Sequence, residues 1–117
     1  MHNPPKPLFH RDIRWPNVVQ QADDRSKWFL IDWEEAACSP TTAAMHLSRV
    51  SHCERVFHDN HTGEVDVWAV GNLAVEAFRT VVGCSNELKS VGSSMRSGEL
   101  DAMGALRMVR ALRERLD

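Results

Sequence analysis

The chain has 117 residues, of which 43% are hydrophobic and 26% are charged, and its formal net charge is −2. This length suits a single domain with one modest core. The small net charge gives no electrostatic reason to expect a nucleic acid or a membrane surface as partner, and no stretch reaches the roughly 18 apolar residues of a membrane-spanning helix. Three cysteines without regular spacing favour reduced thiols, and therefore an intracellular location, either cytoplasmic or nuclear.

The first half of the chain predicts little regular structure. Residues 9–17 read as a loop, and residues 18–32 read as a hairpin because two short runs rich in β-branched and aromatic side chains flank a polar stretch. Residues 33–63 lack periodicity. A connection of that length in a small domain is more often functional than idle.

The second half predicts helices. Residues 64–82 form the strongest helical pattern, and their apolar side chains cover most of the circumference, which is typical of a buried central helix. Residues 83–98 contain three glycines and five serines and are expected to form a loop. In residues 99–116, apolar side chains recur every three or four positions, which predicts a C-terminal helix. The expected fold is therefore mainly α with a short β-hairpin, in one domain spanning residues 1–117.

The pattern H-R-D-x-x-x-x-N is complete in residues 10–17 and carries the chemistry of the chain. A carboxylate at Asp12 can take or orient the proton of an acceptor hydroxyl. Five residues later, the loop can turn the amide oxygen of Asn17 toward a magnesium ion in the same pocket, and Arg14 can contact a phosphoryl group. We therefore assign Asp12, Arg14 and Asn17 as candidate catalytic residues.

A second acidic position, Asp32, lies at the end of the predicted hairpin. A hairpin between residues 18 and 32 would bring Asp32 back to Asp12 and Asn17. Oxygen ligands of this kind suit a hard cation such as Mg²⁺. We expect these three side chains to gather around one point, with Asn17 and Asp32 as the metal ligands.

These landmarks occur in the order and at the spacing of the C-terminal lobe of the protein kinase-like superfamily, which the chain resembles over about residues 9–78. The amino-acid sequence of these segments most resembles that of kinase-like proteins of basidiomycete fungi. The resemblance implies Mg²⁺ and ATP as cofactor and substrate, bound through Asn17 and Asp32, and a residue 33–63 loop like an activation segment. It also implies structural supporting roles for four further residues, namely His10, Arg11, Glu54 and Asp66, the last accepting backbone hydrogen bonds from the catalytic loop.

Arg11 has two readings, a surface cation or the partner of a phosphate on the following segment. By resemblance the phosphate would lie on Ser39, Thr41 or Thr42, where charge-assisted hydrogen bonds would hold it.

The departures from the pattern matter for the substrate. Asp32-Trp33-Glu34 stands in place of D-F-G, and Ile31-Asp32-Trp33-Glu34 is similar to the metal-binding segment of aminoglycoside and choline kinase-type phosphotransferases. The acceptor is therefore open between a protein and a small molecule, with Ser or Thr of a protein as the first expectation. No glycine-rich loop or strand lysine fits into the nine residues before His10. We expect a truncated lobe without its N-terminal lobe, weak or inactive as an isolated chain.

Two alternatives stand beside phosphoryl transfer. The first is an interaction module, a pseudokinase remnant, in which a second copy, a partner protein or a missing N-terminal lobe covers the apolar helix of residues 64–82. The second is a zinc-binding regulatory domain, because imidazole and thiolate groups gather in one stretch of the loop. These groups belong to His46, His52, Cys53, His58 and His61.

Overall fold

A computed structural model of the protein describes residues 7–81, 83 and 85–116, with side chains to residue 114. The fold is mainly α with a short β-hairpin, as the sequence predicts. Where the sequence suggests one domain, the chain divides into two compact units, Met1–Asp66 and Val67–Asp117.

Two small antiparallel pairings organise the first unit. Strands β2 (Val18–Gln20) and β3 (Trp28–Leu30) pair with Val18 opposite Leu30, which confirms the predicted hairpin. Strand β1 (Leu8–Phe9) pairs with β4 (Ala37–Cys38), a contact that local sequence does not reveal. This second pairing brings the residues just before the candidate catalytic loop against the segment that follows the hairpin.

The predicted loop of residues 33–63 is irregular apart from β4 and a 3-10 helix, η2 (Glu54–Phe57). Val56 and Phe57 of η2 are buried with Phe9 in the core of the first unit. The loop is fastened to this core by backbone hydrogen bonds from Ala44 to the Val56 carbonyl and from Asn60 to the Thr41 carbonyl, both 2.9 Å long. The irregular segment therefore has a defined path, which brings His52 and His61 into contact with the candidate catalytic loop.

Helix α1 (Glu64–Thr80) begins in the first unit and continues through the second. Its residues from 65 to 78 are buried or half-buried, apart from Val70. Its buried side chains Val65, Ala69 and Val75 recur on one face, whereas Val70, on the opposite side at helical spacing, is 43% exposed. The predicted end at residue 82 lies outside the described residues.

The expectation of a loop at residues 83–98 is also wrong, because helix α2 occupies Asn86–Ser97. Ser85 caps its start by accepting hydrogen bonds from the backbone of Glu87 and Leu88, and Gly98, at φ 86°, ends it in the left-handed conformation. The helix is rich in polar and small residues, and its buried residues are Val91 and Gly92.

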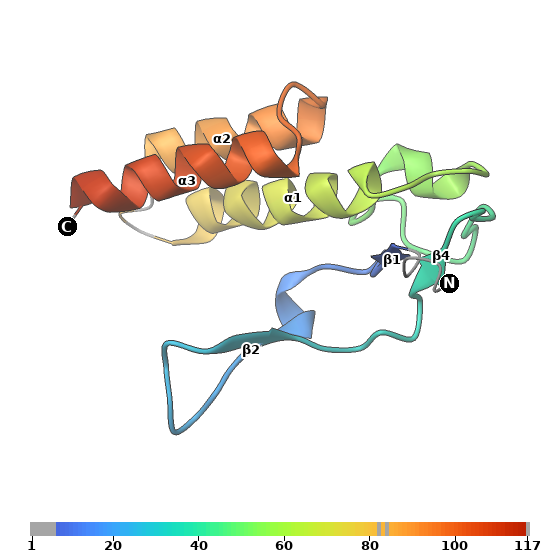
Figure 1. The fold of residues 1–117 in the computed structure, drawn as a ribbon, viewed down its shortest axis with the longest axis horizontal. Helices are drawn as coiled ribbons and strands as arrows, with labels where there is room; N and C mark the ends of the chain where they lie inside the picture. The colour runs from blue at the N-terminus through green and yellow to red at the C-terminus, as the bar shows by residue number, and fades with distance from the viewer. Residues whose placement is uncertain (1–6, 82, 84, 117) are drawn as a thin grey trace, which may run out of the picture. The chain divides into compact units, whose positions relative to one another are not determined.

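Helix α3 (Ala102–Leu116) returns antiparallel beside α2 (Figure 1). It begins three residues later than predicted, since the carboxylate of Asp101 accepts a 2.7 Å hydrogen bond from the Gly104 backbone and acts as its cap. The packing of α2 on α1 depends on two glycines: a Cβ atom on Gly92 would lie 2.7 Å from the Gly71 carbonyl oxygen.

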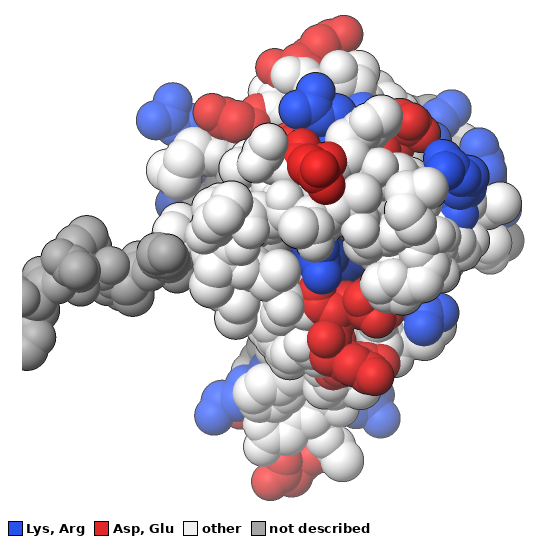
Figure 2. Space-filling view, turned by 90° about the vertical axis from the view of Figure 1, so that its right-hand side faces the viewer, with Lys and Arg blue, Asp and Glu red and all other residues white. Residues whose placement is uncertain are grey.

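Over the described part of the chain, none of the helices has the length and apolar character needed to cross a bilayer. Acidic and basic side chains are interspersed with uncharged surface on the face drawn in Figure 2.

The glycine contact in the second unit gives a stability prediction. We expect Gly92→Ala to lower the free energy of unfolding by about 1–3 kcal/mol, because the added methyl forces α1 and α2 apart. The loss should appear although alanine favours a helix by about 1 kcal/mol over glycine. Urea denaturation followed by circular dichroism measures it. Ser93→Ala, at an exposed neighbouring position of α2, is the control, and equal stability of the two variants would contradict the prediction.

Candidate functional site

The loop of residues 10–17 is held in place by the first turn of α1. The two carboxylate oxygens of Asp66 accept hydrogen bonds from consecutive backbone N–H groups, those of His10 at 2.8 Å and Arg11 at 2.9 Å. Arg11 has a φ of 70°, a left-handed conformation that costs a residue with a side chain about 1–2 kcal/mol. Asp66 therefore stabilises a strained bend at Arg11, and the residue after this bend, Asp12, lies in the site.

His10 links this bend to the end of the hairpin. Its buried ring contacts the carbonyl oxygen of Ile31 through Nε2 at 2.9 Å and the backbone N–H of Asp12 through Nδ1 at 3.1 Å. Because a carbonyl only accepts, Nε2 carries the proton, and Nδ1 accepts from Asp12. Trp33 covers the ring in an edge-on contact, with 4.7 Å between centroids. A neutral imidazole thus joins the loop to the segment that carries Asp32.

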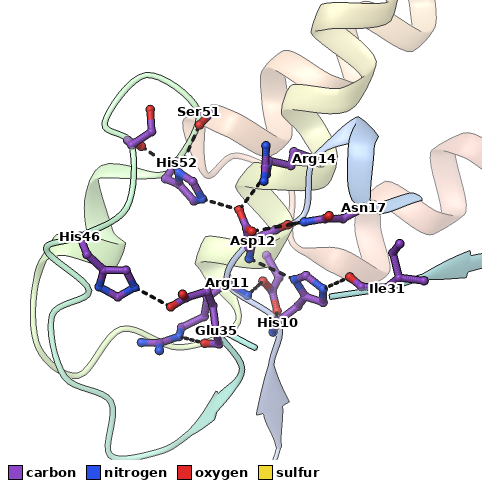
Figure 3. Close-up of polar contacts among 12 residues, drawn as sticks. His10, Arg11, Asp12, Arg14, Asn17, Ile31, Glu35, His46, Ser51 and His52 are labelled. Atoms are coloured by element: carbon purple, nitrogen blue, oxygen red, sulfur yellow. Dashed lines mark hydrogen bonds and ion pairs between the residues drawn. The ribbon is translucent and has the colours of Figure 1, made fainter. Parts of the chain in front are cut away.

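The carboxylate of Asp12 lies at the centre of the site (Figure 3). Oδ1 accepts from Nε of Arg14 at 3.2 Å and contacts Nε2 of His52 at 2.8 Å, and Oδ2 accepts from Nδ2 of Asn17 at 3.2 Å. The same amide nitrogen also donates to the Asp12 carbonyl at 2.8 Å. The structure therefore brings together Asp12, Arg14 and Asn17, and it adds His52, which the sequence pattern placed only in a zinc cluster.

Asp32 is placed by its neighbour rather than by its own carboxylate. The Ile31 backbone donates to the Asn17 carbonyl at 2.9 Å, and its own carbonyl contacts His10, so Asp32 follows directly after a residue fixed to the loop. Asp32 is exposed, with a φ of 61°. Among the contacts of the described residues, none joins the Asp32 carboxylate to Asp12 or Asn17, and the gathering of all three around one cation stays a prediction.

Asn17 and Asp32 carry oxygen atoms of the kind that Mg²⁺ takes as ligands in proteins. Asp12 engages the amide nitrogen of Asn17, and the amide oxygen is the remaining donor atom of that group. Mg²⁺ is commonly bound through one or two protein oxygens together with substrate phosphates and water. A site closed by protein ligands alone is not present, since the described residues contain no group of three or more His, Cys, Asp or Glu able to hold a metal.

Arg11 contacts protein groups in this structure. Its guanidinium donates to the Glu35 carbonyl at 2.6 Å and to Nε2 of His61 at 3.3 Å. Thr41, an expected phosphate carrier, is 3% exposed and donates its hydroxyl to the His61 carbonyl, while Thr42 is exposed and lends its carbonyl to Arg11 at 3.4 Å. Arg11 therefore fastens the irregular segment to the loop, and of these two threonines Thr42 is the exposed one.

The histidines do not form a zinc cluster in the described residues, because each has its own partner. His46 contacts Glu35 at 2.7 Å, His58 contacts the exposed Glu54 at 3.0 Å, and His52 contacts Asp12. Burial raises the pKa of the Cys53 thiol, which favours the protonated form over a metal-binding thiolate.

Glu64, at the start of α1, has a lowered pKa. Its partial burial acts in the opposite direction, but hydrogen bonds from the Thr62 hydroxyl and nearby backbone N–H groups, together with Arg55, outweigh it. The charged carboxylate stabilises the helix N-terminus that holds Asp66 in place.

Comparison with known proteins gives a partial match. No protein-family model matches the chain, and no solved structure matches it. The chain is similar to Crinkler effector protein 8 of Phytophthora infestans, with 47% identity over 68 residues. The aligned region covers 55% of this chain and 11% of that protein, so the chain spans about a tenth of its relative's length.

These findings correct the resemblance drawn from the motifs. The assignment to the protein kinase-like superfamily is not supported by any matching family or structure, and the matching relative is an effector protein from Phytophthora rather than a kinase-like protein of a basidiomycete fungus. Short motifs in the right order define a local arrangement of side chains, and they do not by themselves establish common descent. The chemistry of the site depends on its own contacts and is independent of that assignment.

The contact of Asp66 with the loop gives a second prediction. In Asp66→Asn one of the two acceptor oxygens becomes an NH₂ group, which leaves one backbone N–H of the strained bend without its partner. We expect a loss of about 1–3 kcal/mol in the free energy of unfolding, and faster amide hydrogen exchange at His10 and Arg11. Arg79→Gln, at an exposed position in the last turn of the same helix, is the control and should leave exchange at these two amides unchanged. Unaltered exchange in Asp66→Asn would contradict the assignment.

Proposed function

We propose that the loop around Asp12 transfers a phosphoryl group from ATP to a hydroxyl group, with Ser or Thr of a protein as the acceptor. The observation that supports this function best is the buried, hydrogen-bonded carboxylate of Asp12 beside the amide of Asn17. An anchored carboxylate is the group that orients an acceptor hydroxyl and receives its proton. The proposed reaction takes place inside the cell, in the cytoplasm or the nucleus.

Each residue of the site has one step in this chemistry. The acceptor oxygen forms a bond to the γ-phosphorus, the bond from that phosphorus to the bridging oxygen breaks with its electron pair leaving on ADP, and the proton passes to Asp12. Arg14, whose side chain is 47% exposed, can contact the transferred oxygens by charge-assisted hydrogen bonds. A magnesium ion bound through Asn17 and Asp32 would neutralise charge on the phosphate oxygens.

Rates from this chain alone are expected to be low. Phosphoryl transfer depends on holding the phosphates in position, and the sequence has no G-x-G-x-x-G loop to hold them. Single-turnover assays with radiolabelled ATP at high protein concentration suit such a site better than steady-state turnover.

Replacing Asp12 tests the proposal. We expect Asp12→Asn to lower magnesium-dependent transfer to a generic Ser- and Thr-containing protein by about 100-fold, because the amide does not take a proton. Asp32→Ala should raise the magnesium concentration needed for half-maximal transfer. Asp23→Asn, an exposed carboxylate in the turn of the hairpin, is the control. Transfer by Asp12→Asn at the rate of the unaltered chain would reject the function.

A second candidate function is a protein-interaction module that self-associates. It is favoured by the hairpin, whose side chains Trp28 and Phe29 are 57% and 49% exposed. Two-stranded hairpins are marginally stable alone in water, and this one exposes an aromatic side chain on each of its faces, with Val19 beside Phe29.

Sedimentation velocity over a range of concentrations tests the second candidate. We expect concentration-dependent association, which Trp28→Lys should weaken about tenfold or more. Val50→Lys, at an exposed apolar position outside the hairpin, should leave association unchanged. A folded monomer at high concentration would exclude self-association through this hairpin.

A further inference from the structure

We infer that His52 is a positioning residue for the proposed transfer: it holds Oδ1 of Asp12 and so leaves Oδ2 as the oxygen that receives the proton of the acceptor hydroxyl. The inference rests on the proposed function for its reaction. The contact itself is a property of the structure, and it is measured independently by the NMR experiment described below.

The contact between His52 and Asp12 is the shortest one to this carboxylate. The Nε2–Oδ1 distance is 2.8 Å, against 3.2 Å for both Arg14 and Asn17. The two side chains are 9% and 10% exposed, so water competes little with the bond. The residues are 40 positions apart, and the contact therefore ties the irregular segment to the catalytic loop.

The ring of His52 is itself fixed in orientation. Its Nδ1 lies 2.8 Å from the Ser48 carbonyl oxygen and 3.3 Å from the Ser51 hydroxyl. Since a carbonyl oxygen only accepts, Nδ1 carries a proton, and Nε2 is the atom left for Asp12. Oδ1 is also an oxygen, so the 2.8 Å contact requires a further proton between Nε2 and the carboxyl group.

The two oxygens of Asp12 therefore differ in what they can still accept. Oδ1 is engaged by Arg14 and His52, which uses both of its lone-pair directions. Within the part of the chain that the structure describes, Oδ2 accepts from Asn17 alone. An incoming hydroxyl finds its acceptor at Oδ2, on the side of the carboxylate where Asn17 lies. Without His52 the carboxyl group loses the bond that fixes its rotation.

Activity of matched variants tests this role. We expect His52→Leu to lower the single-turnover rate by about 10- to 100-fold while the half-saturating ATP concentration changes less than about twofold, because orientation and not nucleotide binding is lost. His52→Gln, whose amide can still donate to Oδ1, should stay within about fivefold of the unaltered chain. His46→Leu is the control, since His46 forms a comparable contact with the carboxylate of Glu35 outside the site.

Imidazole NMR tests the contact without any turnover. In protein labelled with ¹⁵N at histidine, we expect a slowly exchanging Nε2 proton for His52, which disappears in Asp12→Ala. The Nε2 proton of His10, bonded to the Ile31 carbonyl, should persist there and shows that the loop is folded. If the His52–Asp12 bond only stabilised the fold, the Nε2 proton of His52 would still be protected. In that case His52→Leu would transfer phosphate at the normal rate.

The outcomes separate the two proposals. A protected Nε2 proton that depends on Asp12, together with loss in His52→Leu and recovery in His52→Gln, supports the role. Full activity of His52→Leu, no recovery in a folded His52→Gln, or absence of the protected proton overturns it. If the unaltered chain transfers no phosphate while the signal depends on Asp12, the proposed function is wrong and the contact stands.

Discussion

The candidate site depends on the carboxylate of Asp66, which lies outside the site itself. Asp66 accepts hydrogen bonds from the adjacent backbone N–H groups of His10 and Arg11, and this pair of bonds holds Arg11 at a φ of 70°. Hydrogen bonds to a charged group contribute about 1.5–3 kcal/mol each, which exceeds the cost of about 1–2 kcal/mol for a left-handed residue with a side chain. The bend is therefore stable as long as the first turn of α1 is formed, and that turn is supported by the charged Glu64.

The bend at Arg11 determines which groups the following residues can contact. The chain reverses so that the Asp12 backbone meets Nδ1 of His10, and the other nitrogen of the same ring fixes Ile31. Ile31 in turn donates to Asn17, whose amide returns to Asp12. The four residues form a closed circuit of hydrogen bonds, and a closed circuit holds a carboxylate more rigidly than separate contacts do.

The parts of the fold and site that sequence predicts are those encoded locally. The hairpin follows from two short runs around a polar turn, and Asp12, Arg14 and Asn17 meet because only five positions separate the first from the last. Sequence does not reveal His52 as a partner of Asp12, because the 40 positions between them span a stretch without periodicity. Helix α2 is missed because its glycines and serines favour a loop, although Leu88, Val91 and Met95 recur at helical spacing. Its caps, Ser85 and Gly98, are the readable signal.

The motif spacing predicts which side chains lie together, and it also suggests a protein family that the comparisons do not support. The first inference depends on local bonds, whereas the second requires common descent. A loop such as residues 10–17 is defined by bonds that any suitable backbone can make, and its chemistry depends on those bonds rather than on ancestry. The asymmetry of Asp12 illustrates this point. Oδ1 contacts Arg14 and His52, and Oδ2 accepts a hydrogen bond from Asn17. The two oxygens of this carboxylate therefore differ in their partners, and the difference depends on the contacts alone and not on kinship.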